Sequence, residues 1–301
     1  MRSGFATIVG RPNVGKSTLV NWIVGEKVTI TSSRPNTTRH QIRGVLTRRD
    51  AQVVFVDTPG LHRPKTQLGK RLNEQAMSAF DDVDVIIALI EANNAIGPGD
   101  RLVLRRSLEV TLRGGPTMMV AVNKTDVAGA SKTAAQLLAA VKAVDDIASD
   151  LGERAQEIAR DIEFFPVSAK KGKGVDELVT AVISHLEEGP SYYPDDMVSD
   201  QGDASHVAEL VREQLLARTR DELPHAIHCQ VTEWENKWIR VEILVERDSQ
   251  KAIVIGKGGE VLKEVGTAVR AQLPPGTHID LYVRVEKHWQ SRPEVLDRFG
   301  I

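Results

Sequence analysis

The chain has 301 residues, more than one domain usually holds and enough to bury a core in each of two. Hydrophobic residues make up 41% and charged residues 27%, with a formal net charge of −2, which is ordinary for a soluble globular protein. The longest largely apolar run, residues 83–90 with Asp84 within it, is too short to span a bilayer. The first strand is expected to begin too early to leave room for a signal peptide. The single cysteine, Cys229, excludes an internal disulfide and is expected to be a buried, inert thiol. We therefore expect a cytoplasmic protein.

The first apolar run, residues 5–9, predicts a buried strand that leads directly into a phosphate-binding loop. The pattern G-x-x-x-x-G-K-[ST] is met by Gly10, Arg11, Pro12, Asn13, Val14, Gly15, Lys16 and Ser17. In such a loop, backbone N–H groups and the positive end of the following helix surround the β-phosphate. Gly10 and Gly15 permit the tight curvature, Lys16 reaches the β- and γ-phosphates, and the Ser17 hydroxyl binds Mg²⁺.

Two segments further along the chain are expected to contact the γ-phosphate and its metal. Residues 34–39 form a polar stretch without periodicity, in which Thr37 or Thr38 should complete the Mg²⁺ shell, and Thr38 is the preferred candidate. Residues 52–56 predict a strand that ends at Asp57, whose carboxylate can hold Mg²⁺ through water. Gly60 then offers a backbone N–H to the γ-phosphate and has the freedom to move.

A second motif identifies the base. The run 118–122 predicts a strand, and Asn123-Lys124-Thr125-Asp126 follows at its carboxyl end, the edge where open α/β sheets bind ligands. An Asp carboxylate accepts hydrogen bonds from N1–H and the 2-amino group of guanine, whereas adenine offers neither donor there. With the wrong base the Asp126 carboxylate would stay buried and unpaired, so the sequence indicates GTP rather than ATP.

The remaining contacts to the base follow from position. Asn123 can reach the N7 side of guanine, and the Lys124 stem can cover the face of the ring. After the run 164–167, Ser168-Ala169-Lys170 completes the set, and the Ala169 N–H is expected to meet guanine O6. The expected GTP-binding residues are Gly10, Arg11, Pro12, Asn13, Val14, Gly15, Lys16, Ser17, Thr18, Asp57, Thr58, Pro59, Gly60, Leu61, Asn123, Lys124, Thr125, Asp126, Ser168, Ala169 and Lys170. Catalytic roles are expected for Lys16, Thr38 and Gly60, and metal ligation for Ser17, Thr38 and Asp57.

Up to residue 188, apolar strands alternate with helical segments, which predicts an α/β P-loop GTPase domain with a mostly parallel sheet covered on both faces. Residues 145–160, with alternating charges and alanines, are interpreted as a solvated helical face, and residues 175–186 show helical apolar spacing. Residues 189–204 are rich in Pro, Gly, Asp and Ser, which is typical of a linker. The expected division is therefore 1–188, a linker 189–204, and a second domain 205–301.

Beyond the linker the pattern predicts a smaller α+β domain in the order α-β-β-α-α-β. The expected elements are helix 207–222, strands 226–232 and 238–246, helices 249–255 and 261–273, and strand 279–285. Gly256-Lys257-Gly258-Gly259 separates the two later helices, as the G-x-x-G loop of a type II KH domain does where it clamps the backbone of unpaired nucleotides. Ile253, Val254 and Ile255 would give the groove an apolar floor. The expected RNA contacts are Lys251, Ile255, Gly256, Lys257, Gly258, Gly259, Lys263 and Arg270.

The wording and order of these motifs resemble the Era family of GTPases over nearly the whole chain. The resemblance lies in residues 10–17, 37–40, 57–62, 222–225 and 254–259. It implies a Mg²⁺-dependent GTPase that binds the single-stranded 3′ end of small-subunit (16S) rRNA and assists assembly of the 30S subunit. It also implies weak peripheral association with the inner face of the cell membrane. We expect a monomer.

Two other functions stay open. One is a GTP-sensing RNA-binding checkpoint protein with little turnover. The other is a GTPase of tRNA modification, against which the KH domain and the lone cysteine argue.

Leu61 stands where many GTPases place a water-orienting Gln, so slow intrinsic hydrolysis is expected. Asn13 either ligates K⁺ beside the α- and γ-phosphates, as in some relatives, or only hydrogen-bonds within its loop.

Two features depart from the family pattern. In the second domain acidic residues slightly outnumber Lys and Arg, so attraction for RNA must come from local basic patches. The tail after Trp289 is short and ends Phe299-Gly300-Ile301. Lys287, His288 and Arg292, near Trp289, are too few to establish membrane contact, and a solvated chain end is expected there.

Overall fold

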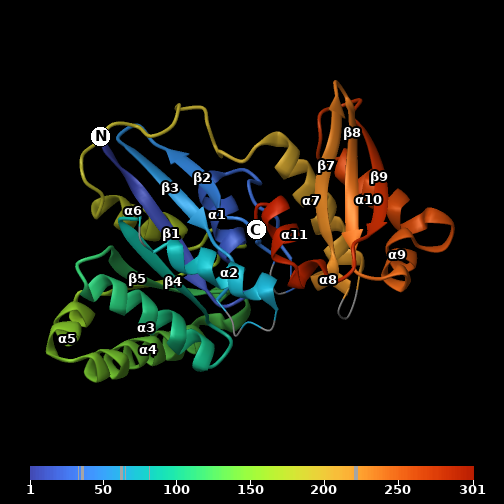
Figure 1. The fold of residues 1–301 in the computed structure, drawn as a ribbon. Helices are drawn as coiled ribbons and strands as arrows, with labels where there is room; N and C mark the ends of the chain where they lie inside the picture. Colours follow the sequence, from blue (N-terminus) through green and yellow to red (C-terminus); the bar gives the residue numbers. More distant parts are fainter. Residues whose placement is uncertain (33, 35–36, 62–63, 65, 81, 220–222) are drawn as a thin grey trace. The chain divides into compact units, whose positions relative to one another are not determined.

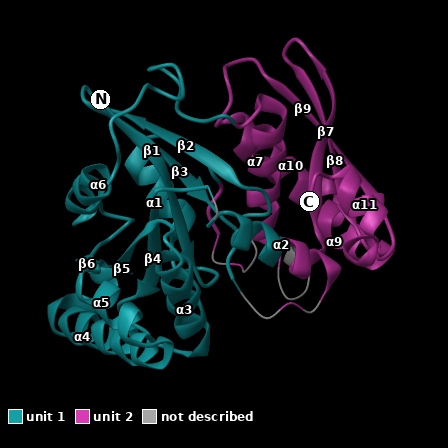
Figure 2. Ribbon diagram, turned by 60° about the vertical axis from the view of Figure 1, so that its left-hand side comes forward, with its two compact units in different colours: residues 1–29, 38–63, 72–200 teal, residues 30–37, 64–71, 201–301 magenta. Residues whose placement is uncertain are grey.

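The computed structural model describes residues 1–32, 34, 37–61, 64, 66–80, 82–219 and 223–301. Pro35, Asn36, His62 and Glu222, which belong to segments interpreted above, lie outside these described residues. The chain divides into two compact units, coloured separately in Figure 2. Unit 1 comprises Met1–Thr29, Thr38–Arg63 and Leu72–Asp200, and unit 2 comprises Ile30–Thr37, Pro64–Arg71 and Gln201–Ile301.

Within the described residues of unit 1, six strands form one sheet in the order β2-β3-β1-β4-β5-β6 (Figure 1). Neighbouring strands are parallel except for β2 and β3, which are antiparallel, so the predicted mostly parallel sheet is confirmed. The strands are buried along most of their length, as expected where helices cover both faces. They are β1 (Arg2–Gly10), β2 (Ile42–Thr47), β3 (Ala51–Asp57), β4 (Val85–Glu91), β5 (Thr117–Asn123) and β6 (Glu163–Pro166).

Helices lie on both faces of this sheet. α1 (Lys16–Val24) and α6 (Val175–Ser184) bury their apolar residues in one aliphatic cluster, on one face. α3 (Pro98–Leu112), α4 (Thr125–Leu151) and α5 (Glu153–Arg160) share a second cluster on the other face, together with the later part of α2 (Gln67–Ser78). Residues 145–160 therefore contribute buried alanines to the core, and their interpretation as only a solvated face was incomplete.

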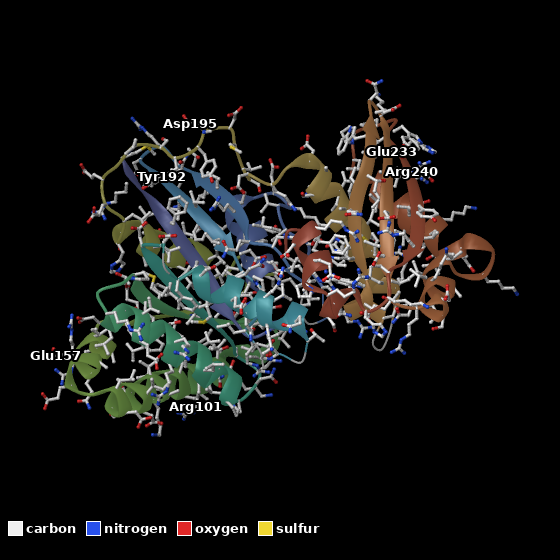
Figure 3. All side chains as sticks on the ribbon, in the orientation of Figure 1. Arg101, Glu157, Tyr192, Asp195, Glu233 and Arg240 are labelled. Carbon is white, nitrogen blue, oxygen red and sulfur yellow. The ribbon has the colours of Figure 1, made fainter. Side chains whose placement is uncertain are left out.

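Unit 2 contains the smaller sheet. Its described residues include three strands in the order β7-β8-β9, of which β7 and β8 are antiparallel and β8 and β9 parallel. Arg240 of β8 pairs with Glu233 of β7 at 2.8 Å near the hairpin (Figure 3). α7 and α10 pack with the sheet in one apolar core. The elements are α7 (Asp203–Arg218), α8 (Leu223–Ala226), β7 (His228–Glu235), β8 (Trp238–Val245), α9 (Asp248–Ile255), η1 (Lys257–Gly259), α10 (Glu260–Arg270) and β9 (His278–Val285).

The boundaries of α7 differ from the predicted helix 207–222. The helix begins at Asp203 and ends at Arg218, because Thr219 takes an extended backbone conformation with φ −104° and ψ 157°. Cys229 is buried in β7, which confirms the expectation of a buried free thiol.

The connecting segment 189–200 is irregular but bonded to unit 1. The Gln52 side chain accepts from the backbone N–H groups of Tyr192 and Tyr193, at 2.7 and 3.0 Å. The Tyr192 ring, labelled in Figure 3, lies edge-on to Phe5 with ring centroids 4.8 Å apart. The Val45 N–H donates to Val198 O at 2.9 Å beyond the edge of β2. These contacts order segment 189–200 within unit 1, although its composition is typical of a linker.

The C-terminal segment is packed, and the expectation of a solvated chain end was wrong. Trp289, in η2 (Trp289–Ser291), has no exposed surface and donates from Nε1 to Ala226 O at 2.9 Å. The Phe299 ring, just beyond α11 (Pro293–Arg298), stacks on His228 with centroids 4.1 Å apart. Apolar side chains late in the chain add to unit 2 because they remove hydrocarbon surface from water. Among the described helices, none is long and apolar enough to cross a membrane.

Candidate functional site

The loop after β1 forms a narrow backbone cradle. Asn13 and Gly15 take left-handed conformations, with φ of 67° and 103°. A Cβ on Gly15 would lie 2.3 Å from Asn123 Nδ2, and one on Gly60 would lie 2.7 Å from the backbone N of Pro12. These close approaches require glycine at both positions. Such a turn at the start of α1 gathers backbone N–H groups where an anion can meet them.

Lys16 is the first residue of α1 and its side chain is buried. Its Nζ donates to Gly10 O at 3.4 Å and to Arg11 O at 3.2 Å, both carbonyls of the same loop. Burial lowers the pKa of Lys16 from 10.5 to about 8, although the charge of Asp57 opposes this shift. An ammonium group surrounded by loop carbonyls is placed to gain strongly from a bound phosphate.

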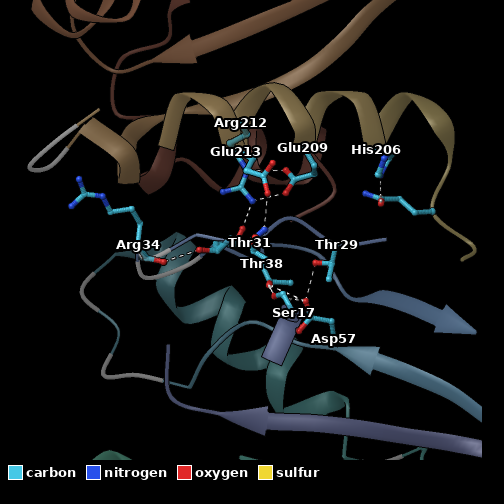
Figure 4. Close-up of polar contacts among 12 residues, drawn as sticks. Ser17, Thr29, Thr31, Arg34, Thr38, Asp57, His206, Glu209, Arg212 and Glu213 are labelled. Carbon is cyan, nitrogen blue, oxygen red and sulfur yellow. Dashed lines mark hydrogen bonds and ion pairs between the residues drawn. The ribbon is translucent and has the colours of Figure 1, made fainter. Parts of the chain in front are cut away.

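The residues predicted to bind metal meet at the end of β3. Asp57 Oδ2 accepts from Ser17 Oγ at 2.7 Å and from Thr38 Oγ1 at 3.2 Å, and these two hydroxyls lie 3.1 Å apart (Figure 4). Thr29 Oγ1 also donates to Asp57 Oδ2 at 2.9 Å, a contact that no sequence motif indicated. Thr38 is buried, so its surroundings differ from an ordinary solvated loop.

The Asp57 carboxylate fits a hard cation. It is fully buried, and its Oδ1 has no hydrogen-bond partner among the described residues. Burial raises its pKa, opposed by the charge of Lys16 and by its three hydroxyl donors. One carboxylate and two hydroxyl oxygens, from Ser17 and Thr38, are donors that Mg²⁺ accepts beside phosphate oxygens and water. The donor set therefore fits the expected ion.

The two expected base-binding segments lie together at the ends of β5 and β6. Ser168 Oγ donates to Asp126 Oδ1 at 2.7 Å and thereby orients the carboxylate expected to recognise guanine. Asn123 Nδ2 donates to Val14 O at 2.8 Å, and the Ala169 N–H donates to Asn123 Oδ1 at 2.9 Å. Asn123 thus braces the phosphate loop against residues 168–170. The expected contacts of Asn123 with N7 and of Ala169 with O6 stay predictions.

Two charged partners of these motifs were missed by sequence reasoning. Lys124 Nζ pairs with Glu91 at the end of β4 and donates to Asn13 O at 2.7 Å. Arg11 Nη1 pairs with the buried Asp100 at 2.8 Å, near the start of α3. The sequence offered no signal for either pair, because neither acidic residue belongs to a recognised motif.

Some residues in the expected GTP set have structural contacts here. Thr58 Oγ1 donates to Ile8 O at 3.0 Å and is fully buried. The Leu61 N–H donates to Gly10 O at 3.2 Å, while its side chain lies in the apolar cluster beneath. Pro59 is also buried, Thr18 is half-buried on α1, and Lys170 is exposed.

In unit 2 the G-x-x-G residues form a sharp exposed turn between α9 and α10. Gly256, Gly258 and Gly259 all have positive φ, at 76°, 61° and 81°. A Cβ on Gly258 or Gly259 would meet nothing within 4 Å, so the turn is open to an approaching backbone. Lys257, within the turn, and Lys263, in α10, are exposed.

The neighbouring surface differs in part from prediction. Ile253 is 57% exposed and Ile255 is half-buried, but Val254 is fully buried in the core and cannot line a groove. Lys251 Nζ lies 5.8 Å from the ring centroid of Tyr282, an exposed residue of β9 that sequence reasoning did not select. An exposed aromatic ring beside a lysine suits base stacking and phosphate attraction.

The structure does not bring Arg270 to this turn. It ends α10, and eleven residues of helix place it about 16 Å from Gly259. Its Nη2 donates to Thr267 Oγ1 at 3.1 Å. Arg270 therefore lies about two turns of α10 beyond Lys263, and its expected RNA contact stays a prediction.

Comparisons with known proteins agree with this arrangement. A family model described as 50S ribosome-binding GTPase matches residues 5–124, and one described as KH domain matches residues 222–290. GTPase Era of Mycolicibacterium smegmatis is 46% identical over 310 residues, which cover 99% of this chain and 98% of the relative. GTPase Era of Mycobacterium tuberculosis (strain ATCC 25177 / H37Ra) is 46% identical over 309 residues, with the same coverage.

Two solved structures match over the full length. Era in complex with MgGDPNP and nucleotides 1506–1542 of 16S ribosomal RNA gives a TM-score of 0.88 at 34% identity, covering 100% of this chain and 99% of that one. A variant of Era from Aquifex aeolicus bound to GDP and AlF4⁻ gives 0.87 at the same identity and coverage. Fold and site together define a P-loop GTPase joined to a KH domain. The chain belongs to the Era GTPase family.

Proposed function

We propose that this GTPase binds Mg²⁺–GTP in unit 1, binds the single-stranded 3′ end of small-subunit (16S) rRNA through the KH turn, and assists assembly of the 30S subunit. One observation carries the nucleotide part: Ser17 and Thr38 converge on the buried Asp57. The relative solved with MgGDPNP and 16S rRNA nucleotides supports both ligands. The domain division 1–188, 189–204 and 205–301 is proposed with it.

The proposed roles follow from the positions of the donors. Mg²⁺, when bound, offsets the charge of the β- and γ-phosphates. Lys16 holds the same phosphates by its ammonium group, and Gly60 offers its backbone N–H to the γ-phosphate. Thr38 contributes its hydroxyl to the metal shell, and Asp126 recognises the base. Because Lys16 carries a positive charge into a buried site, it stabilises charge that develops on the phosphates during transfer.

The deciding experiment measures GTP hydrolysis by the full chain with and without purified small-subunit assembly particles. We expect slow hydrolysis alone and at least about tenfold stimulation by the particles, equal to about 1.4 kcal/mol of barrier. Lys16→Ala should abolish both rates and serves as the control for contaminating activity. Fast hydrolysis that ignores the particles would contradict a role in assembly.

A GTP-sensing checkpoint protein with little turnover is the second candidate, and Leu61 favours it. The leucine side chain is 6% exposed and cannot hydrogen-bond water, so the water-orienting group found at this position in many GTPases is replaced by a core residue. The same assay separates the candidates. A checkpoint protein would bind particles in the presence of GTP and release less than about one phosphate per chain.

We also propose that Asn13 ligates K⁺ beside the α- and γ-phosphates. Its left-handed φ of 67° fixes the loop backbone where the phosphates are expected, and a monovalent cation there would offset developing charge as an arginine finger does. Hydrolysis should then be faster in K⁺ than in Na⁺ at equal ionic strength, and Asn13→Ala should remove the difference. Equal rates in the two salts would leave Asn13 as a loop residue only.

A monomeric state, a cytoplasmic location and weak membrane association stay predictions. The burial of Trp289 removes the aromatic side chain that a membrane contact near Lys287 and Arg292 would use. Co-sedimentation with anionic vesicles tests the association.

A further inference from the structure

Helix α7 holds both ends of segment 30–37, and all of these residues belong to unit 2. Near its start, the Thr31 N–H donates to Glu213 Oε1 at 3.0 Å (Figure 4). At its end, Arg212 Nη2 donates to the backbone carbonyl of Thr37. Between these contacts, Arg34 Nη2 donates to Thr219 O at 3.0 Å, just beyond the helix.

The charges that make these contacts are buried. Arg212 has no exposed surface, and its guanidinium donates to Glu209 through Nε at 2.8 Å and through Nη2 at 2.5 Å. Glu209 and Glu213 are 7% and 8% exposed. Burial by itself lowers the pKa of Arg212, but the charge and hydrogen bonds of Glu209 outweigh it and the net shift is upward. Arg212 therefore remains a cation at physiological pH.

Such a pair is a costly way to stabilise a helix, because two charges must be removed from water. An aliphatic pair of similar volume would stabilise α7 as well or better. The Arg212–Glu209 pair has a specific role if the oriented guanidinium of Arg212 determines the position of a group outside the pair. Outside α7, its guanidinium donates to the Thr37 carbonyl. α7 is itself anchored, since Val211 and Leu215 are buried in the core of unit 2.

The Thr37 carbonyl has a direct influence on the next residue. Thr37 C=O and Thr38 N–H belong to one planar peptide group, so fixing the carbonyl fixes the direction in which the chain enters Thr38. In unit 1, the Thr38 hydroxyl lies 3.2 Å from Asp57 Oδ2 and 3.1 Å from Ser17 Oγ. One peptide bond therefore connects the carbonyl that Arg212 holds, that of Thr37, to Thr38 in the proposed metal shell.

We propose that Arg212, oriented by Glu209, is a positioning residue that holds segment 30–37 so that Thr38 enters the Mg²⁺ shell of bound GTP. The proposal rests on the proposed GTP site. It makes the hydroxyl supplied by Thr38 dependent on a helix of the RNA-binding unit. GDP binding without metal uses the phosphate loop and Asp126, and does not depend on this grip.

The test variant must remove the hydrogen bond from Arg212 to the Thr37 carbonyl and keep helix α7 folded. Arg212→Ala alone would take from the buried Glu209 carboxylate the guanidinium that donates to it, which is strongly destabilising. The double variant Arg212→Met/Glu209→Leu replaces the pair by apolar side chains of similar volume. Arg218→Met is the matched control, because Arg218 is on the same helix and its guanidinium bonds to Gln214 and Glu264. Both variants should keep the melting temperature of the parent within a few degrees.

Hydrogen exchange on the nucleotide-free full chain gives the first measurement. In the double variant the backbone amides of Arg34 and of residues 37–39 should exchange at least about tenfold faster than in the parent, because α7 no longer holds the Thr37 carbonyl. The Arg218→Met control should match the parent. Unchanged protection of Arg34 and residues 37–39 in the double variant overturns the proposal, whatever the state of the nucleotide site.

Nucleotide affinity gives the second measurement. Affinity for a non-hydrolysable GTP analogue with Mg²⁺ should fall about tenfold in the double variant, as expected for a lost interaction with a charged donor. Affinity for GDP in EDTA should stay within about twofold, because a positioning role acts only through the metal shell. An equal loss for both ligands indicates general damage and overturns the proposal.

If the double variant does not fold, Arg212→Lys replaces it. Lysine keeps the charge but cannot form the two-point contact with Glu209, so the same two effects are expected at smaller size. Failure of the parent itself to bind guanine nucleotide would contradict the proposed function, and the exchange measurement would still test the grip of α7.

Discussion

At the scale of single residues, Lys16 has the environment with the largest consequence. Burial brings its pKa to about 8, so the nucleotide-free protein loses this charge within the working range of pH. The unfolded chain keeps the proton up to about pH 10.4, so the unfolded state binds more protons between these values. Stability of the nucleotide-free protein should therefore rise with pH across that window, whereas phosphate binding requires the charged form.

Nucleotide binding should accordingly take up a proton at alkaline pH. Calorimetric titration with GDP in two buffers of different ionisation enthalpy should show uptake of more than about half a proton at pH 8.5 and almost none at about pH 7. Lys16→Arg is the control, since a guanidinium stays charged throughout. Uptake that is the same in the parent and in this variant would show that Lys16 is not the titrating group.

Leu61 is a core residue as well as an expected neighbour of the γ-phosphate. Leu61→Gln would bury an amide in an apolar cluster, at a cost of about 1–3 kcal/mol, and should lower the melting temperature by several degrees. Single-turnover hydrolysis should not fall by orders of magnitude, because leucine has no hydrogen bond to lose. Leu61→Met keeps the volume and should change neither quantity much. A collapse of hydrolysis in a folded Leu61→Gln variant would mean that leucine has a positive catalytic role.

Sequence reasoning was most successful for residues whose chemistry is local. Lys16 and Ser17 belong to one short loop, Asp57 ends a recognisable strand, and Thr38 is one of two threonines in a short polar stretch. Thr29 and Glu91 were missed although they contact Asp57 and Lys124. Neither has a motif around it, and only the folded backbone brings it within hydrogen-bonding distance.

At the scale of elements, the order of strands and helices was predictable, but the direction of individual side chains was less so. The alternation along the first part of the chain predicted the parallel sheet, and the α-β-β-α-α-β order predicted the second unit. Val254 was misplaced because a helix distributes three consecutive apolar residues around its axis, and only part of that run can face outward. Arg270 lies at the end of α10 away from the turn, and its expected RNA contact stays a prediction.

The turn between α9 and α10 permits a sharp test of RNA binding. Gly258 has φ 61° and ψ 22°, a left-handed conformation that Asp and Asn tolerate better than most residues, and a Cβ there would meet nothing within 4 Å. Gly258→Asp should therefore fold and place a negative charge against the RNA phosphates. Affinity for a short single-stranded RNA from the small-subunit 3′ end should drop at least about tenfold, or 1.4 kcal/mol, in gel-shift assays.

Gly258→Asn is the matched control for that test. It has nearly the same size and backbone preference as Asp but no charge, so it should lose less affinity than Gly258→Asp. The difference between the two variants should shrink as salt increases, because the repulsion is screened. If Gly258→Asp binds the RNA as tightly as the parent, the KH turn does not contact the phosphate backbone.

At the scale of the whole molecule, the sequence predicted two domains but not their membership. Segments 30–37 and 64–71 lie within the first part of the chain and yet group with unit 2. Composition gives no sign of this, because a polar stretch such as 34–39 shows no preference for one core over another. The grouping depends on contacts with residues far along the chain, such as Arg212 with Thr37 and Arg71 with Asp297.

Nucleotide affinity and RNA affinity should nevertheless be independent of each other when no GTP is bound. Asp126→Asn replaces the carboxylate that accepts from N1–H and the 2-amino group of guanine, and should weaken GDP binding by at least about tenfold. The Asn side chain offers one acceptor and one donor, which suits xanthine, where a carbonyl replaces the 2-amino group, so affinity for XDP should rise. RNA affinity of the nucleotide-free variant should equal that of the parent, and Gly258→Asp should show the reverse pattern. Nucleotide titrations and gel shifts on the full chain measure nucleotide affinity and RNA affinity in parallel. A loss of RNA affinity in Asp126→Asn would show that the guanine site acts on the KH turn even without nucleotide.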